Sequence, residues 1–291
     1  MVHIFEKTCK TESNKYGLVK IEDEEILKKG PCIITILAGP ISKKSINGSL
    51  RQVAKLVNPN IDTIYDKDRR IFGLGFGEYK EEQERFTRVD PTEDELNVFM
   101  EKYFYPLIKQ NNNKIDVLTA MKNLRNLTFI TYCNGAKTFV KIERKLEQKM
   151  LELGYTSLEI SMILSQIALA AVSGEIIKKR NTKTLSITFG DVLDKDFEKN
   201  EGIFNNKMFS KEGYIQYNNS LGYGIKDDGE HSFKKHMTEN EMLSNKIKIF
   251  LETSLDNAVY NYYSNTVIEP ITYEKIENAY NKSNVNTILR R

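Results

Sequence analysis

Short apolar runs rich in β-branched residues recur along the chain and predict the strands of a buried sheet. The first run, Cys32 to Ala38, stops at Gly39 and Pro40, as expected where a buried strand ends in a turn. The run at 167–173 is also compatible with the end of a helix, because so short a segment shows no clear period. Strands are predicted at 32–38, 71–76, 127–131, 167–173 and 185–189, and short antiparallel edge strands at 3–5 and 16–21.

Between these runs, apolar residues recur at three- and four-residue steps, which is the spacing of one face of an amphipathic helix. The first such segment follows Asp90-Pro91-Thr92 and has an acidic first turn, and both features favour a helix start. Two further helices are predicted at 136–153 and 239–263. Because helices alternate with strands, the sequence predicts an α/β fold with a mostly parallel central sheet and helices on both faces.

A single domain is expected over residues 1–263. The chain has 291 residues, 40% of them hydrophobic, which is enough for one substantial core. Polar segments at about 42–68 and 194–219 are predicted to be insertions, placed as lids over a site at the carboxyl ends of the strands. Residues 264–291 are expected to form a C-terminal tail or a frayed helix.

The charge pattern does not indicate a nucleic-acid partner. The net charge is only +3, and basic and acidic residues interleave along the chain. No apolar stretch is long enough to span a bilayer, and the N-terminal residues lack the apolar core of a signal peptide. We therefore expect a cytoplasmic protein, with export as an effector that has no cleavable signal as the alternative.

Composition also argues against metal and nucleotide chemistry. The 3 cysteines and 3 histidines form no zinc-binding pattern, so we expect free thiols, a reducing compartment, no metal and no cofactor. No phosphate-binding GxxxxGK[ST] loop is present. The glycines at 73, 75 and 77 are interpreted as a strand against which another element packs closely, not as a dinucleotide-binding loop. Phe139 stands where a Cys-x5-Arg phosphatase loop would need arginine.

The sharpest local feature is the segment in which the strand at 127–131 passes through Cys133 directly into the helix from 136. A nucleophile on such a strand–turn–helix corner has an unusual backbone conformation, so the residues two before and two after it must be small. Thr131 and Gly135 are those residues here. The corner places the sulfur at the positive end of the following helix, which favours the thiolate form.

In this corner and in the order of the residues that follow, the sequence resembles the α/β-hydrolase superfamily, with cysteine in place of serine as in dienelactone-hydrolase-like members. The resemblance implies that the nucleophile, Cys133, follows the fifth strand. It implies an acid after a later strand, which Asp191 or Asp194 would supply after the strand at 185–189. It also implies a histidine before the final helix, where His231 precedes the helix from 239. Thr131 departs from the glycine that is commoner in the family.

The resemblance further implies an oxyanion hole made of two backbone N–H groups. One belongs to the residue after the nucleophile, Asn134, and the other to the loop after the third strand. Proline has no N–H, so in the loop Gly39-Pro40-Ile41 the donor would be Gly39 or Ile41. The expected activity is that of a hydrolase or acyl transferase that forms an acyl-enzyme on Cys133 from an ester, a thioester or an activated amide.

Simpler interpretations of the same residues remain open. Cys133 could be a small buried residue that ends a strand, because free cysteine is among the most buried residue types. Asp191 and Asp194 could be ordinary turn or cap residues, and His231 a surface residue. The chain would then be a non-catalytic α/β scaffold that binds a protein partner or a small molecule, with contacts from Tyr214, Tyr217 and Tyr223.

Overall fold

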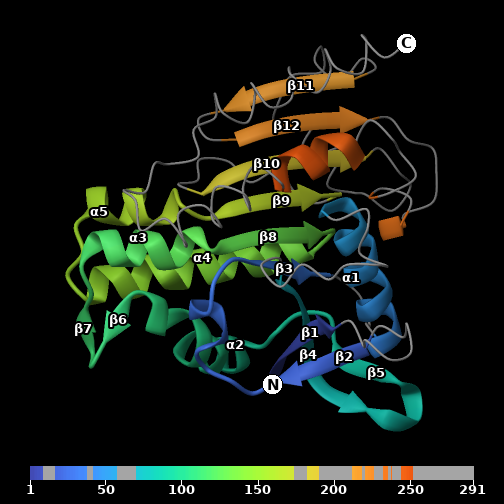
Figure 1. The fold of residues 1–291 in the computed structure, drawn as a ribbon, viewed down its shortest axis with the longest axis horizontal. Coiled ribbons are helices and arrows are strands. Elements are labelled where there is room, and N and C mark those ends of the chain that lie inside the picture. Colours follow the sequence, from blue (N-terminus) through green and yellow to red (C-terminus); the bar gives the residue numbers. More distant parts are fainter. Residues whose placement is uncertain are drawn as a thin grey trace.

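A large mixed sheet forms the centre of the computed structural model (Figure 1). The residues described are 1–8, 17–37, 42–57, 70–173, 182–189, 212–217, 220–225, 232–234, 237 and 244–251. The strands run in the order β11-β12-β10-β9-β8-β3-β4-β1-β2, and β5 pairs with β4 only. The strands of this sheet are β1 (Val2–Thr8), β2 (Gly17–Ile21), β3 (Cys32–Ile36), β4 (Arg70–Lys80), β5 (Arg85–Arg88), β8 (Leu127–Tyr132), β9 (Ala168–Val172), β10 (Lys183–Phe189), β11 (Glu212–Tyr217) and β12 (Ser220–Ile225).

The six central strands, β4, β3, β8, β9, β10 and β12, run parallel to one another. The edges are antiparallel, where β1 pairs with β4 and β2, and β11 pairs with β12. The α/β class, the mostly parallel sheet and the strands predicted from the apolar runs are therefore confirmed. The segment at 167–173 contains the strand β9 and not a helix end.

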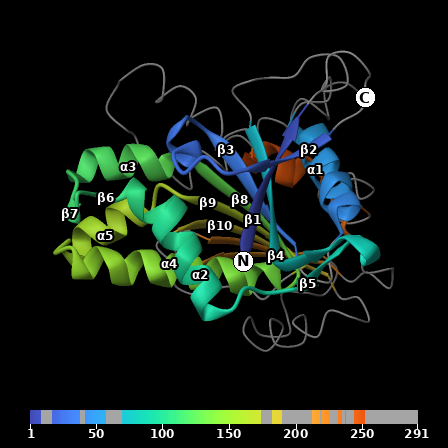
Figure 2. The same ribbon diagram turned by 90° about the horizontal axis from the view of Figure 1, so that it is seen from below.

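The helices lie on both faces of the sheet (Figures 1 and 2). Side chains alternate along β3, so Ile34 and Ile36 face one core cluster while Ile33 faces the other. The helix at 244–251 packs on the same side as Ile33, with Ile247 and Phe250 buried there. The helical elements are α1 (Lys43–Val57), α2 (Glu93–Phe99), a π turn (Met100–Phe104), α3 (Val117–Arg125), α4 (Gly135–Glu152), α5 (Ser157–Leu164) and 3-10 turns at Ile26–Lys28, Glu81–Gln83 and Tyr105–Leu107.

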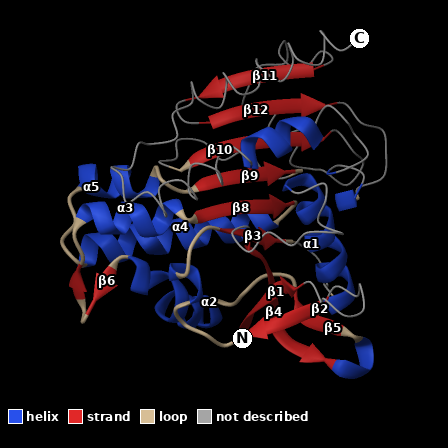
Figure 3. Ribbon diagram, viewed as in Figure 1, coloured by secondary structure: helices blue, strands red, loops and turns tan. Residues whose placement is uncertain are grey.

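The helix predicted after Thr92 begins where expected and then changes its winding. The Thr92 side chain accepts a hydrogen bond from the Glu95 N–H while the Glu95 carboxylate accepts one from the Thr92 N–H, which is a capping box. Beyond Phe99 the chain widens into the π turn. A separate two-stranded hairpin, β6 (Lys109–Gln110) and β7 (Asn113–Lys114), follows it, as the colouring by secondary structure in Figure 3 shows.

Part of the expected insertion at 42–68 is a core element instead. Residues 43–57 form α1, and its Ile46, Leu50 and Val53 are completely buried between the helix and the sheet. The segment looked like a loop because serine, asparagine and glycine interrupt it, but its buried residues keep the helical spacing. The lid interpretation therefore does not hold for 43–57.

The other expected segments are described only in part. Strand β11 occupies 212–217 of the expected insertion at 194–219, and the remainder of that insertion lies outside the described residues. Residues 244–251 of the helix predicted at 239–263 are helical. The tail at 264–291 also lies outside the part of the chain that is described.

The glycines of β4 allow two close approaches to the sheet. A Cβ atom on Gly73 would lie 2.8 Å from the Ile46 side chain of α1, and one on Gly75 would lie 2.6 Å from the Phe86 ring of β5. A residue larger than glycine at either position would push these neighbours away. The interpretation of this segment as a strand against which other elements pack closely is therefore confirmed.

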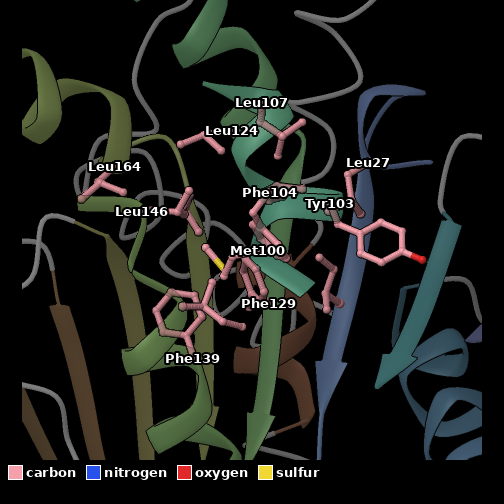
Figure 4. Close-up of a cluster of buried hydrophobic side chains, with 14 of the residues drawn as sticks. Leu27, Met100, Tyr103, Phe104, Leu107, Leu124, Phe129, Phe139, Leu146 and Leu164 are labelled. Atoms are coloured by element: carbon pink, nitrogen blue, oxygen red, sulfur yellow. The ribbon is translucent and has the colours of Figure 1, made fainter. Parts of the chain in front are cut away.

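The larger core cluster lies between the sheet and helices α2 to α5 (Figure 4). Phe129 of β8 is at its centre, 4.8 Å from the Phe139 ring of α4 and 6.2 Å from the Phe104 ring, measured between centroids. These rings, with Leu124 and Leu146, are completely buried. The cluster therefore fixes α4 against β8, the two elements that flank Cys133.

Candidate functional site

Cys133 lies at the corner between the carboxyl end of β8 and the start of α4, as expected (Figure 1). Its φ angle is +53°, in the left-handed region that few non-glycine residues adopt. Its N–H donates to the Val172 carbonyl of β9 at 3.0 Å, and its own carbonyl accepts from the Ala136 N–H at 3.2 Å. The side chain is half-buried, so the thiol is partly accessible at the end of the strand.

Position 135 requires glycine because α4 starts directly against the end of β3. A Cβ atom at this position would lie 2.2 Å from the Ile36 carbonyl oxygen, well inside contact distance. Thr131 is the register partner of Ile36 and is completely buried. The requirement for small residues on both sides of Cys133 thus has a direct cause at Gly135, where a helix and a strand end meet.

The Asn134 backbone N–H is placed at the first turn of α4. Asn134 is the N-cap residue, with φ −60°, and its side chain makes no capping hydrogen bond. Its carbonyl accepts from the Lys137 N–H at 2.9 Å, but no acceptor within the described part of the chain is paired with its own N–H. An unpaired N–H at a helix start favours a negatively charged ligand atom.

Phe233, two positions after His231, contacts Tyr132, the residue before Cys133. The Phe233 ring packs edge-on against the Tyr132 ring, with 5.2 Å between centroids and 86° between planes. Phe233 and Cys133 both pack against the cluster on the α1 side of the sheet. His231 itself lies outside the described residues, but the chain two positions after it is at the end of β8.

The remaining predicted site residues also lie outside the described part of the chain. Asp191 and Asp194 follow Phe189, the last residue of β10, and β10 is parallel to β9 and so ends at the same edge of the sheet as β8. Gly39 and Ile41 follow Leu37, the last described residue after β3. Of the predicted site residues, the structure therefore describes two, Cys133 and Asn134, which are consecutive in the chain.

Ser173 is a residue at this edge that the sequence did not indicate. It follows β9, is 1% exposed, and has φ +51°. Tyr132 and Val172 are register partners, so Cys133 and Ser173 are the next residues on two neighbouring strands, and both turn into the left-handed region. In the sequence, Ser173 is recognisable only as the polar residue that ends an apolar run, and this pattern does not indicate a positive φ angle.

The other positive φ angles in the described part of the chain occur at glycines or in turns, where they are common. Glycine occupies positions 30, 77 and 154, the asparagines at 111 and 112 form the β6–β7 turn, and Glu84 ends an exposed 3-10 turn. Cysteine and serine at the ends of β8 and β9 are the exceptions among the described residues. Side chains kept at strained positions are more common at functional sites than elsewhere.

The strain at Ser173 can be measured with two substitutions that both remove the hydroxyl. Ser173→Gly is expected to be more stable than Ser173→Ala by about 1 kcal/mol, because glycine tolerates positive φ and alanine does not. Urea unfolding of the two variants tests this difference. Equal stabilities would mean that the residue does not have the left-handed conformation.

Cys32 provides an internal contrast to Cys133. Cys32 starts β3 and is completely buried. Burial raises the pKa of its thiol to about 12, so at neutral pH it is uncharged as well as inaccessible. We therefore expect Cys32 to be chemically inert in the folded protein, whereas Cys133 is partly exposed.

Other classes of site are not evident in the described residues. No group of three or more potential metal ligands occurs among them, and no helix there is both long and apolar enough to cross a bilayer. The tyrosines considered as scaffold contacts lie on the outer strands, where Tyr214 and Tyr223 are register partners. Neither a scan against models of known protein families nor a search of curated proteins returned a match to this chain.

Proposed function

We propose that this protein is a hydrolase or acyl transferase of α/β-hydrolase-like fold, with Cys133 as its nucleophile. The observation that carries the proposal is the left-handed corner at Cys133, φ +53°, between a buried strand and a long helix. Such a corner exposes a side chain at the top of a sheet and places it beside helix-start N–H groups.

The order of elements supports this assignment. Apart from β5 and the β6–β7 hairpin, β8 is the fifth strand along the chain, the position that the resemblance gives the nucleophile. Asp191 and Asp194 follow β10, and His231 comes after β12 and before the helix at 244–251. The order Cys, Asp, His thus follows β8, β10 and β12 along the chain, three strands of the parallel part of the sheet.

The contact between Phe233 and Tyr132 supports a role for His231 in particular. Consecutive Cα atoms are about 3.8 Å apart, so a residue two positions from Phe233 lies within about 8 Å of it along the chain. Tyr132 is the neighbour of Cys133, and its ring contacts the Phe233 ring. The contact thus joins the residue before Cys133 to a residue two positions after His231 in the chain, which supports His231 as the proposed base.

In the proposed reaction, His231 takes the proton of the Cys133 thiol, and the sulfur attacks the acyl carbon and forms a new S–C bond while the negative charge moves to the acyl oxygen. The Asn134 N–H and a second N–H, from Gly39 or Ile41, would stabilise that oxygen. The bond to the leaving group then breaks, and His231 donates a proton to the leaving atom. His231 next removes a proton from water, which attacks the thioester and releases the acid and the thiol; Asp191 or Asp194 would orient His231.

Alkylation of Cys133 tests the proposal without a known substrate. Iodoacetamide labelling is followed by mass spectrometry from pH 5 to 9, with Cys32 and Cys9 as references in the same sample. We expect Cys133 to label below pH 7 at least about tenfold faster in the natural protein than in His231→Ala, because the imidazolium stabilises the thiolate. The matched control is His236→Ala, which removes the neighbouring histidine and is expected to leave the rate unchanged.

Two results would contradict the proposal. One is Cys133 labelling at the same rate in His231→Ala as in the natural protein, and the other is an equal loss of rate in His236→Ala. If the expected profile is found, a screen of esters and thioesters with Cys133→Ala as the blank identifies the acyl group.

A further inference from the structure

A pocket at the edge of the sheet is lined by residues from the open end of the β1–β2 hairpin and from α2 with its π turn. It has a volume of about 470 Å³ and shares no residue with the Cys133 site. That volume falls in the range of about 300–1,000 Å³ typical of small-molecule sites. We call it the edge pocket and define it by Val2, Ile21, Val98, Phe99 and Tyr103, with a charged rim.

The inside of the edge pocket is apolar and aromatic. The Phe99 and Tyr103 rings lie 5.4 Å apart at an angle of 52° and form one wall. The Tyr103 hydroxyl donates to the Ile21 carbonyl at 3.3 Å, so its polar atom is already paired. Val98, also part of the lining, is an apolar residue that is 67% exposed.

The π turn at Met100–Phe104 is a second, independent indication. Such turns are rare, cost helical hydrogen-bond geometry, and occur frequently at functional sites. Here the turn carries both Lys102 and Tyr103 to the pocket, while Met100 and Phe104 remain buried in the main core. The π turn therefore contributes residues to the pocket lining while its other residues keep their places in the core.

The rim carries as many positive as negative groups, with the Met1 amino group, Lys20 and Lys102 against Glu22, Asp94 and Glu95. Glu22 forms ion pairs with Lys20 and Lys102, and Lys102 also lies 3.8 Å from a Glu24 oxygen. Glu95 accepts from the Thr92 N–H and pairs with Arg88 at 3.1 Å. Because the rim has no net charge and a charged ligand would lose hydration on entering the apolar interior, the pocket favours neither sign of charge.

From this geometry we propose that the edge pocket is a binding site for a small uncharged aromatic or aliphatic molecule. Burial of the ligand's apolar surface against the pocket walls, and above all against the exposed Val98, drives binding. The site is separate from Cys133 and does not depend on the activity proposed there. Because few polar contacts are available, the affinity is expected to be modest, with a Kd on the order of 100 µM.

Indole tests the proposal directly, because the chain contains 0 tryptophan residues and indole fluorescence therefore reports only the probe. Titration of the full chain is compared with indole-3-acetate and tryptamine, which carry the same ring with a negative or a positive charge. We expect saturable binding of indole at one site and at least about tenfold weaker binding of both charged analogues.

A matched pair of variants locates the site. Val98→Glu places a charge at the mouth and is expected to weaken indole binding at least about tenfold. Leu118→Glu makes the same change on α3 at a residue of similar exposure, 63% against 67%, and is expected to have no effect. Unchanged melting temperatures show that both variants fold. Absence of saturable indole binding, equal affinity for the charged analogues, or unchanged binding in Val98→Glu would each overturn the proposal.

Discussion

Replacement of Phe129 by alanine is expected to lower the free energy of unfolding by about 4 kcal/mol. The ring is completely buried in β8 and packs against Phe104 and Phe139, which belong to two of the helical segments that cover this face (Figure 4). Its removal leaves a cavity that neighbours on a rigid sheet cannot fill, so the loss of burial and the cavity both contribute.

Urea unfolding measures this change, and Leu158→Ala serves as its control. Leu158 of α5 is 71% exposed, so its replacement is expected to change the stability by less than about 0.5 kcal/mol. Comparable losses in the two variants would contradict the packing described for β8. Phe129→Ala is also expected to loosen the pairing of β8 with its neighbour β3. Faster labelling of the buried Cys32, which is the register partner of Leu127 at the start of β8, would report this change.

Replacement of Gly135 by alanine is expected to destabilise the protein by about 3 kcal/mol. The new Cβ atom would lie 2.2 Å from the Ile36 carbonyl oxygen, which belongs to the backbone of a central strand and cannot move aside cheaply. The start of α4 must shift instead, and with it the Asn134 N–H and the Cys133 corner. We therefore expect altered alkylation of Cys133 together with the loss of stability.

Gly48 of α1 is the matched control for Gly135. Both are helical glycines, but a Cβ atom on Gly48 would meet nothing within 4 Å. Gly48→Ala is therefore expected to stabilise the protein by about 0.5 to 1 kcal/mol, because alanine loses less conformational entropy in a helix. Changes of the same sign in the two variants would show that the close approach at Gly135 is absent.

The strands that the sequence predicted well are those covered on both faces. All residues of β3, β8 and β9 are buried, so each strand reads as a continuous apolar run. Strands β11 and β12 escaped prediction because glycine, tyrosine and polar residues alternate there without an apolar run. Their place in the sheet depends on pairing with β10 and with each other, which are contacts between distant parts of the chain.

The edge pocket could not have been predicted from the sequence. The apolar residues of α2 indicate a helix, but a helical pattern does not distinguish a regular turn from the π turn at Met100–Phe104. Nor does it indicate that the open end of the β1–β2 hairpin lies against Val98 and Phe99. The pocket depends on the packing of α2 against the edge strands β1 and β2, which is a contact between segments far apart in the chain.

The sequence by itself determined the α/β class, the buried central strands and the corner at Cys133. These are local properties, because burial on two faces produces apolar runs and a strand–turn–helix corner needs small residues at fixed steps. Only the tertiary structure decided that α1 belongs to the core, that Ser173 turns beside Cys133, and that Phe233 packs on Tyr132. These depend on strand register and on contacts between segments far apart in the chain, for which a single sequence carries no signal.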